Sequence, residues 1–297
     1  MTQNRRRDSP VEHGFPHLET VRAAVTALFR RLTADGIRAY GTPFAPADAE
    51  FPASEELYPG AHRVASAMVR ALRLPDARLI VAFRPMEEAA TVELTAGPEY
   101  FVEVSDRFRV HRRDLAAALA HEVTHVLLHW LDLRFPTTPD NEILTDTAAA
   151  YLGAGWLLLD AYREDELTHQ KLGYLTPEEF GYVLARRGRF LGGEDLSAWF
   201  TSPRAYEAYV RGRALADREL RRAPLAAAGR PERLRYAAAR RAGAAAPGAP
   251  YGFEEHAGGL RVSFPCPVCG QRLRLPARRG PILARCGLCR TVLDCDT

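Results

Sequence analysis

Residues 111–131 carry the feature that most constrains the fold, a long helical pattern with two histidines on one face. The segment runs HRRDLAAALAHEVTHVLLHWL without proline or glycine, and its many alanines and leucines favour helix. His121 and His125 lie about one turn apart, so their ring nitrogens can converge on a single ion. Because unpaired polar groups are costly beside an apolar face, the pattern predicts a metal ion at this helix. Apolar residues at three- and four-residue steps predict the buried stripe: Leu115, Leu119, Val123, Val126, Leu127 and Trp130.

Glu122 follows the first histidine and completes the pattern H-E-x-x-H. In this pattern the two histidines bind zinc, and the glutamate takes a proton from the attacking water without being a ligand. The pattern is short, so the alternative is an ordinary surface helix whose polar groups are satisfied without metal. His129 repeats the four-residue step, but ligands along one straight helix climb about 6 Å per step and cannot all reach one ion. We therefore interpret His129 as a helix-surface or core histidine.

A second helix is predicted from about 139 to 162, after the break FPTTP, with Thr138 as its cap and Pro139 at its first position. It begins with N-E-I-L-T-D, in which Glu142 and Asp146 lie four residues apart on one face. If this helix returns antiparallel to the first, Glu142 can reach the metal. Asp146 can then accept a hydrogen bond from the other ring nitrogen of a ligand histidine. The alternative is a solvated helix start, where the helix dipole favours acidic residues.

Together, H-E-x-x-H and the following N-E-x-x-T-D resemble the motifs of the gluzincin zinc metallopeptidases, including the thermolysin-like enzymes, which carry a similar N-E-x-x-S-D. The resemblance covers about 30 residues. It implies a zincin-like catalytic domain that hydrolyses peptide bonds. The site residues that it implies are the zinc ligands His121, His125 and Glu142, the general base Glu122, and Asp146 as the partner of His121.

The residues before the first helix predict a small β-sheet. We expect a strand at 78–83 and a hairpin whose strands are 91–95 and 100–104. In zincin folds an edge strand beside the metal pairs with extended substrate, and the strand at 100–104 is our candidate, with an ordinary core hairpin as the alternative. The oxyanion-stabilising residue of the family lies in a part that does not align with this chain. Three residues are candidates for that role: Tyr151, His169 and Tyr174.

The cysteines predict a second metal site near the C-terminus. Two C-x2-C pairs separated by 16 residues form the pattern of a four-cysteine zinc ribbon: Cys266, Cys269, Cys286 and Cys289. Because protein ligands fill all positions, this zinc is expected to be structural, and a module of this size needs its metal to fold. Cys295 lies outside the pattern and is interpreted as a spare thiol. Three glycines suit the tight turns of a ribbon: Gly270, Gly280 and Gly287.

The length allows one catalytic domain and a smaller module, and with the predicted elements the resemblance implies an α+β chain with a mainly helical zincin-like catalytic domain, a small β-sheet and a small C-terminal zinc ribbon. We expect the metallopeptidase domain at 1–221, a linker rich in Ala, Arg, Pro and Gly at 222–258, and the ribbon module at 259–297. The sequence shows no secretory signal and no membrane-spanning segment. All five cysteines follow residue 265, which favours metal binding in the cytoplasm over disulfides.

Charge divides the chain unevenly. Residues 1–210 carry 23 basic and 30 acidic side chains, whereas residues 211–297 carry 17 arginines and 7 acidic residues. Such asymmetry indicates an anionic partner for the C-terminal region, which can be nucleic acid, a protein or the acidic domain of the same chain.

Three hypotheses follow from these patterns. The leading one is a cytoplasmic metallopeptidase with one catalytic and one structural zinc, acting on a peptide or protein substrate. The second is a zincin-fold regulatory or binding protein whose basic tail and zinc ribbon engage nucleic acid or a protein partner. In the third, the basic tail docks on the catalytic domain and regulates it.

Overall fold

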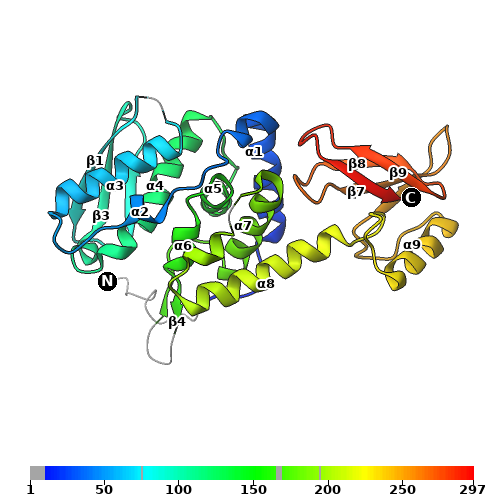
Figure 1. Ribbon diagram of the computed structural model, residues 1–297. Coiled ribbons are helices and arrows are strands. Elements are labelled where there is room, and N and C mark those ends of the chain that lie inside the picture. Colours follow the sequence, from blue (N-terminus) through cyan, green and yellow to red (C-terminus); the bar gives the residue numbers. More distant parts are fainter. Residues whose placement is uncertain (1–10, 75, 165–168, 194) are drawn as a thin grey trace, which may run out of the picture.

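A small sheet, a set of packed helices and a C-terminal β module follow one another across the molecule (Figure 1). The computed structural model describes residues 11–74, 76–164, 169–193 and 195–297, and the fold belongs to the α+β class. Within these ranges, none of the helices is both long enough and apolar enough to cross a membrane.

Helix α4, Leu115–Trp130, carries the histidine motif and is almost entirely buried up to Leu128. The apolar stripe predicted for it packs in the core, with one exception. Trp130 was expected in that stripe but is 57% exposed. It is the last residue of the helix, and Leu131 directly after it is the C-cap. His129 beside it is also exposed.

The single helix expected at 139–162 is in fact two helices. Helix α5 spans Thr138–Leu152, and helix α6 spans Trp156–Asp160. Gly153 ends α5 in the left-handed conformation with φ of 108°, which glycine adopts without steric cost. The predicted cap was also one residue late. Thr137 is the N-cap, and its hydroxyl accepts a hydrogen bond from the backbone N–H of Asp140 at 3.2 Å.

The predicted hairpin forms in a three-stranded sheet with the order β1-β3-β2. Strands β1, Arg78–Arg84, and β3, Glu99–Ser105, are parallel, whereas β2, Ala90–Glu93, is antiparallel to β3. The prediction that strand 100–104 is the substrate-binding edge was wrong, because β3 has a partner on both sides. The edge strand that contacts α4 is β2. Helix α3, Leu57–Ala71, packs against β1 and α4.

Two further helices pack against the second motif helix, and a third packs behind them. Helices α1, Leu18–Arg38, and α7, Pro177–Leu191, pack against α5, and α8, Pro203–Leu220, packs against α7. Helix α7 begins with a capping box formed by Thr176 and Glu179. The remaining short elements outside the C-terminal module are α2, Pro46–Ala49, β4, Arg163–Glu164, β5, His169–Gln170, and the 3-10 turns η1, Asp106–Arg109, η2, Arg112–Asp114, and η3, Leu196–Trp199.

The C-terminal module consists of one helix and two antiparallel sheets (Figure 1). Helix α9 spans Arg230–Ala242. One sheet contains β6, β7 and β8, and the other contains β9 and β10. The bounds of these strands are Gly252–Glu254 for β6, Arg261–Pro265 for β7, Arg272–Pro276 for β8, Pro281–Arg285 for β9 and Val292–Asp296 for β10.

The segment expected to be a linker, 222–258, is bonded to the ribbon strands. The N–H of Ala226 donates to the carbonyl of Asp294 at 2.9 Å, and the N–H of Asp296 donates to the carbonyl of Pro224 at 2.7 Å. The buried Tyr236 of α9 donates from its hydroxyl to the carbonyl of Thr297 at 3.2 Å. Residues 222–258 are therefore joined to the ribbon by hydrogen bonds. The domain boundaries stay predictions.

Candidate metal centres

Three predicted ligands converge between α4 and α5. The Nε2 atoms of His121 and His125 are 3.0 Å apart, and the Oε2 atom of Glu142 lies 3.1 Å from the first and 3.3 Å from the second. Their side chains are 11%, 21% and 17% exposed, so the group borders the surface without facing it fully. This group could hold a metal ion.

Asp146 holds His121 from the opposite side of the ring. The Nδ1–H of His121 donates to Oδ1 of Asp146 at 2.8 Å, which leaves the lone pair of Nε2 facing the other donors. The second oxygen of Asp146 accepts the backbone N–H groups of Tyr174 and Leu175. Gly173 allows this approach, because a β-carbon there would lie 2.6 Å from Oδ2 of Asp146. A fully buried carboxylate therefore ties α4, α5 and the loop before α7 together.

Thr145 orients the ring of His125 in the same way, a role that was not predicted from the sequence. The hydroxyl of Thr145 donates to the carbonyl of Asn141 at 2.9 Å and so accepts from Nδ1–H of His125 at 3.3 Å. The Asn141 side chain in turn exchanges two hydrogen bonds of 2.7 Å with the backbone of Phe135. The signal was present in N-E-x-x-T-D, where Thr145 lies one turn after Asn141 and beside Asp146.

Without a bound cation, the histidines and carboxylates of the group stabilise one another's charges. The pKa of Glu142 falls to about 2, since hydrogen bonds from His121 and His125 outweigh the opposing effect of its burial. Burial also disfavours a charged His121, but Asp146 and Glu142 outweigh it and raise the pKa of this ring well above its ordinary value. Two imidazoles and one carboxylate suit zinc, for which tetrahedral bonds of about 2.0 to 2.1 Å place donors about 3.3 Å apart.

Glu122 lies next to the group but is not one of the converging donors. It is 6% exposed on α4, and its burial raises the pKa of its carboxyl group. The neighbouring charges of both histidines act in the opposite direction. Glu142 therefore contributes its carboxylate to the donor set, and the carboxylate of Glu122 beside it is more basic than that of a solvated glutamate.

The other residues considered for this site lie in different surroundings. Among the described residues, His129 is not part of a group that could hold a metal. Tyr151 is fully buried, and its hydroxyl has no partner in the described structure. Tyr174 is 45% exposed, and its ring lies 5.8 Å from the ring of His121. The side chain of His169 lies outside the described residues. Of the two oxyanion candidates whose side chains are described, Tyr174 is therefore the one beside the converging donors.

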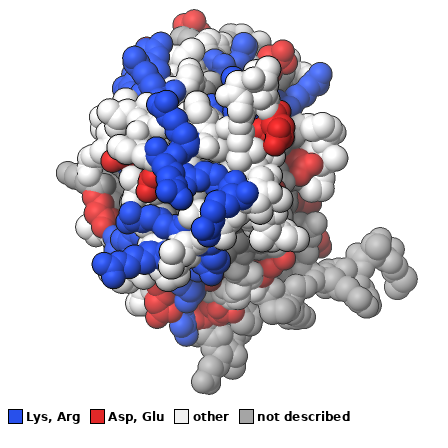
Figure 2. Space-filling view, turned by 90° about the vertical axis from the view of Figure 1, so that its right-hand side faces the viewer, with Lys and Arg blue, Asp and Glu red and all other residues white. Residues whose placement is uncertain are grey.

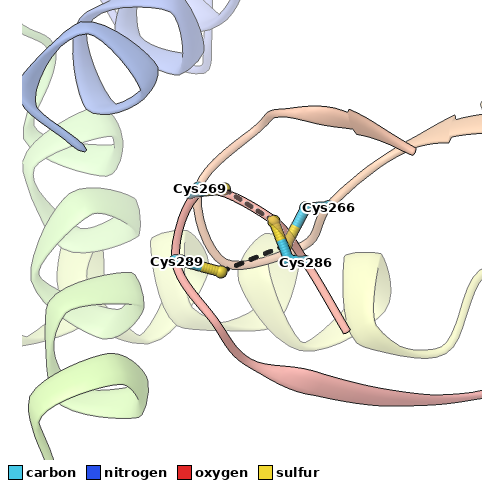
Figure 3. A group of neighbouring side chains, drawn as sticks. All are labelled: Cys266, Cys269, Cys286 and Cys289. Carbon is cyan, nitrogen blue, oxygen red and sulfur yellow. Dashed lines mark hydrogen bonds between the residues drawn. The ribbon is translucent and has the colours of Figure 1, made fainter. Parts of the chain in front are cut away.

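The second group consists of four buried cysteines (Figure 3). The sulfur atoms of Cys266 and Cys289 are 3.7 Å apart, and those of Cys269 and Cys286 are 3.5 Å apart. Four thiols at these separations could hold a metal ion and are compatible with a zinc ribbon. Cys295 is buried outside the group, and its thiol points to the carbonyl of Leu293 at 3.8 Å.

The two cysteine turns have matching backbone hydrogen bonds. Gly270 donates its N–H to the carbonyl of Cys266, and Arg290 donates to that of Cys286, both at 2.9 Å. Gly270 has the positive φ expected for it, at 78°. Gly287 was expected in a tight turn of the same kind, but the positive φ of the second turn belongs to Arg290, at 63°. The left-handed residue follows the last cysteine of each pair, whereas Gly287 follows the first.

The first cysteine turn lies against α1. The hydroxyl of Thr26 donates to the carbonyl of Cys269 at 2.6 Å. A β-carbon at Gly270 would lie 2.6 Å from that hydroxyl oxygen, so glycine is required for this approach. Arg290 of the second turn donates to Asp35 at 2.7 Å. The ribbon is thus seated on the helix that packs against α5. Among the described residues, no hydrogen bond or ion pair joins it to the converging histidines or to Glu142.

A scan against models of known protein families, a search of curated proteins and a search of solved structures found nothing that matches this chain.

Proposed function

We propose that this chain is a zinc-dependent peptidase of the gluzincin type, with His121, His125 and Glu142 as ligands. The observation that carries the proposal is the convergence of two Nε2 atoms and one carboxylate oxygen within 3.3 Å, each histidine oriented through its Nδ1 atom. A zinc ion bound by these donors supplies Lewis acidity, which polarises a carbonyl and lowers the pKa of water. The five free cysteines suit a reducing compartment, so the cytoplasm is the proposed location.

In this proposal Glu122 moves the protons. Its carboxylate accepts a proton from the attacking water, whose oxygen forms the new bond to the scissile carbonyl carbon. The same group then donates that proton to the leaving nitrogen as the C–N bond breaks. Burial favours this cycle, because it raises the pKa of the Glu122 carboxyl group and makes it a better proton acceptor. Tyr174 is the proposed partner for the negative charge on the carbonyl oxygen.

The edge strand β2 supports an extended peptide as the substrate. It is antiparallel to β3, contacts α4 and has no other partner in the described part of the sheet. A peptide added to this edge would gain backbone hydrogen bonds along α4, the helix that carries His121 and Glu122. This assigns to β2 the role that the sequence had suggested for strand 100–104.

The test is the full chain carrying Glu122→Gln, assayed against a mixture of quenched fluorescent peptides. Loss of the proton acceptor should lower the cleavage rate by about 100-fold or more while bound zinc is unchanged. His121→Ala should lose one zinc per chain, whereas His129→Ala, on the same helix, should keep both. Undiminished cleavage by the Glu122→Gln protein would reject the mechanism, and undiminished zinc in His121→Ala would reject the site.

A further inference from the structure

The C-terminal module presents a strongly basic surface that the peptidase proposal does not use. Residues 222–297 contain 13 arginines and 5 acidic residues. A band of basic side chains crosses the end of the molecule that this module forms (Figure 2). We call five of the six exposed arginines of the ribbon the basic surface: Arg272, Arg274, Arg278, Arg279 and Arg285; the sixth, Arg290, is paired with Asp35.

The strands fix these arginines in place. Along β8, Arg272 and Arg274 are exposed while Leu273 between them is buried, so the two guanidinium groups share one face of the sheet, with backbones about 7 Å apart. Arg272 donates from Nη1 to the hydroxyl of Ser263 on β7 at 2.9 Å. Arg285 ends β9, and Arg278 and Arg279 lie in the turn between β8 and β9. The positive charges are therefore carried on a scaffold of paired strands.

Acidic residues of the chain neutralise little of this charge. Arg274 pairs with Glu254 at 3.5 Å across the sheet. In the described part of the chain, Arg278, Arg279 and Arg285 form no ion pair. Between the described residues of the ribbon and of the helical part, one ion pair forms, and it joins Arg290 to Asp35. The acidic part of the chain is therefore not the partner of the basic surface in this structure.

The chemistry of the surface favours phosphate over a protein interface. Protein interfaces depend on buried aromatic and apolar anchors, but the large hydrophobic residues exposed on this module are three aliphatic ones: Leu234, Leu283 and Val292. Its aromatic residues form no exposed stacking platform for unpaired bases, because Tyr236 and Phe264 are buried and the half-buried Tyr251 and Phe253 pack on Tyr236 and on each other. Guanidinium groups bind phosphate oxygens in a bidentate manner.

We propose that the basic surface binds the phosphate backbone of a nucleic-acid duplex, without reading its bases. DNA and RNA duplexes offer the same phosphate chemistry, and the experiment separates them. The full chain is titrated into short fluorescent DNA and RNA duplexes of one sequence, the matching single strands, and polyglutamate, at several salt concentrations. The duplexes should bind most tightly, and the logarithm of the affinity should fall linearly with the logarithm of salt.

Two double variants with the same change in net charge sharpen the test. Arg279→Glu with Arg285→Glu should weaken duplex binding by about tenfold or more and lower the salt slope by about two. Arg70→Glu with Arg134→Glu replaces exposed arginines outside the module and should stay within about twofold of the unaltered protein. Zinc content and melting temperature verify that both variants are folded. Equal weakening in the two variants, tighter binding of single strands or polyglutamate, or no dependence on salt would each overturn the proposal.

Discussion

At the scale of residues, the proposed catalytic site depends on what orients each donor. Hydrogen bonds from the Nδ1 atoms of His121 and His125 to the carboxylate of Asp146 and the hydroxyl of Thr145 orient the two rings so that Nε2 faces the other donors. Asp146 has a further task, because its second oxygen accepts two backbone N–H groups of the loop that follows Gly173. One buried carboxylate therefore links the metal site to the loop that carries Tyr174.

Asp146→Asn tests this dual role. The amide cannot accept at all the positions that the carboxylate serves, and it carries no charge to support His121. We expect zinc affinity at this site to fall by about 10- to 100-fold and the stability of the fold by about 1 to 3 kcal/mol. Competition with a chelator and thermal unfolding measure the two effects. Asp132 is exposed just after α4, so Asp132→Asn makes the same chemical change and should alter neither value. Unchanged zinc affinity in the Asp146→Asn protein would contradict the role of Asp146 in supporting His121.

At the scale of elements, the helices behind the site are held by very close packing of α7 on α8. A β-carbon at Gly212 would lie 2.2 Å from the backbone nitrogen of Tyr182 and 2.4 Å from the carbonyl of Glu178. Gly181 approaches α8 in the same way, with Tyr209 and Ala208 as its neighbours. Both glycines lie in helix interiors, where glycine is unfavourable, so their presence reflects the backbone contact between the two helices.

Gly212→Ala should therefore destabilise the protein. The methyl group would have to displace backbone atoms of α7, which costs about 1 to 3 kcal/mol or more. Gly188→Ala on α7 provides the comparison, because its added carbon meets nothing within 4 Å and should stabilise the helix by about 0.5 to 1 kcal/mol. Chemical denaturation of both variants measures the difference. Equal stability of the Gly212→Ala and Gly188→Ala proteins would contradict the close packing of α7 on α8 at Gly212.

At the scale of the whole molecule, the ribbon is anchored on α1 through its first cysteine turn. The contact joins Thr26 to the carbonyl of Cys269, and it is close enough that Gly270 cannot carry a side chain. Arg290 occupies the matching position of the second turn with a similar φ, so the turn itself accepts a side chain. The requirement for glycine at residue 270 comes from docking and not from metal binding.

Two glycine variants separate the effect of docking on α1 from the effect of a positive φ in the turn. Gly270→Ala and Gly280→Ala both place alanine at a positive φ, which costs about 1 to 2 kcal/mol in each. Only the first meets α1, since an added carbon at Gly280 has nothing within 4 Å. We expect Gly270→Ala to keep its zinc but to speed amide hydrogen exchange in α1 and the ribbon together, whereas Gly280→Ala affects its own turn alone. Equal exchange in α1 for both variants would contradict the docking.

The sequence by itself determined the local features. Spacing on a helix brought His121 and His125 to one face, and the C-x2-C spacing brought the two cysteines of each pair together, because these contacts lie between near neighbours in the chain. The helix break at Gly153 and the exposure of Trp130 were not predicted, since a run of helix-favouring residues says little about where packing partners end.

Contacts between distant segments could not be predicted from local patterns and are seen in the folded chain. The fold placed β3 in the centre of the sheet and left β2 at the edge, which no local pattern in either strand distinguishes. It also brought the loop at Gly173 to Asp146, seated the ribbon on α1, and joined the expected linker to β10. The physical reason is that helix faces and metal-ligand spacings are set by covalent geometry, whereas pairings across the chain depend on the burial and hydrogen bonding of the whole fold.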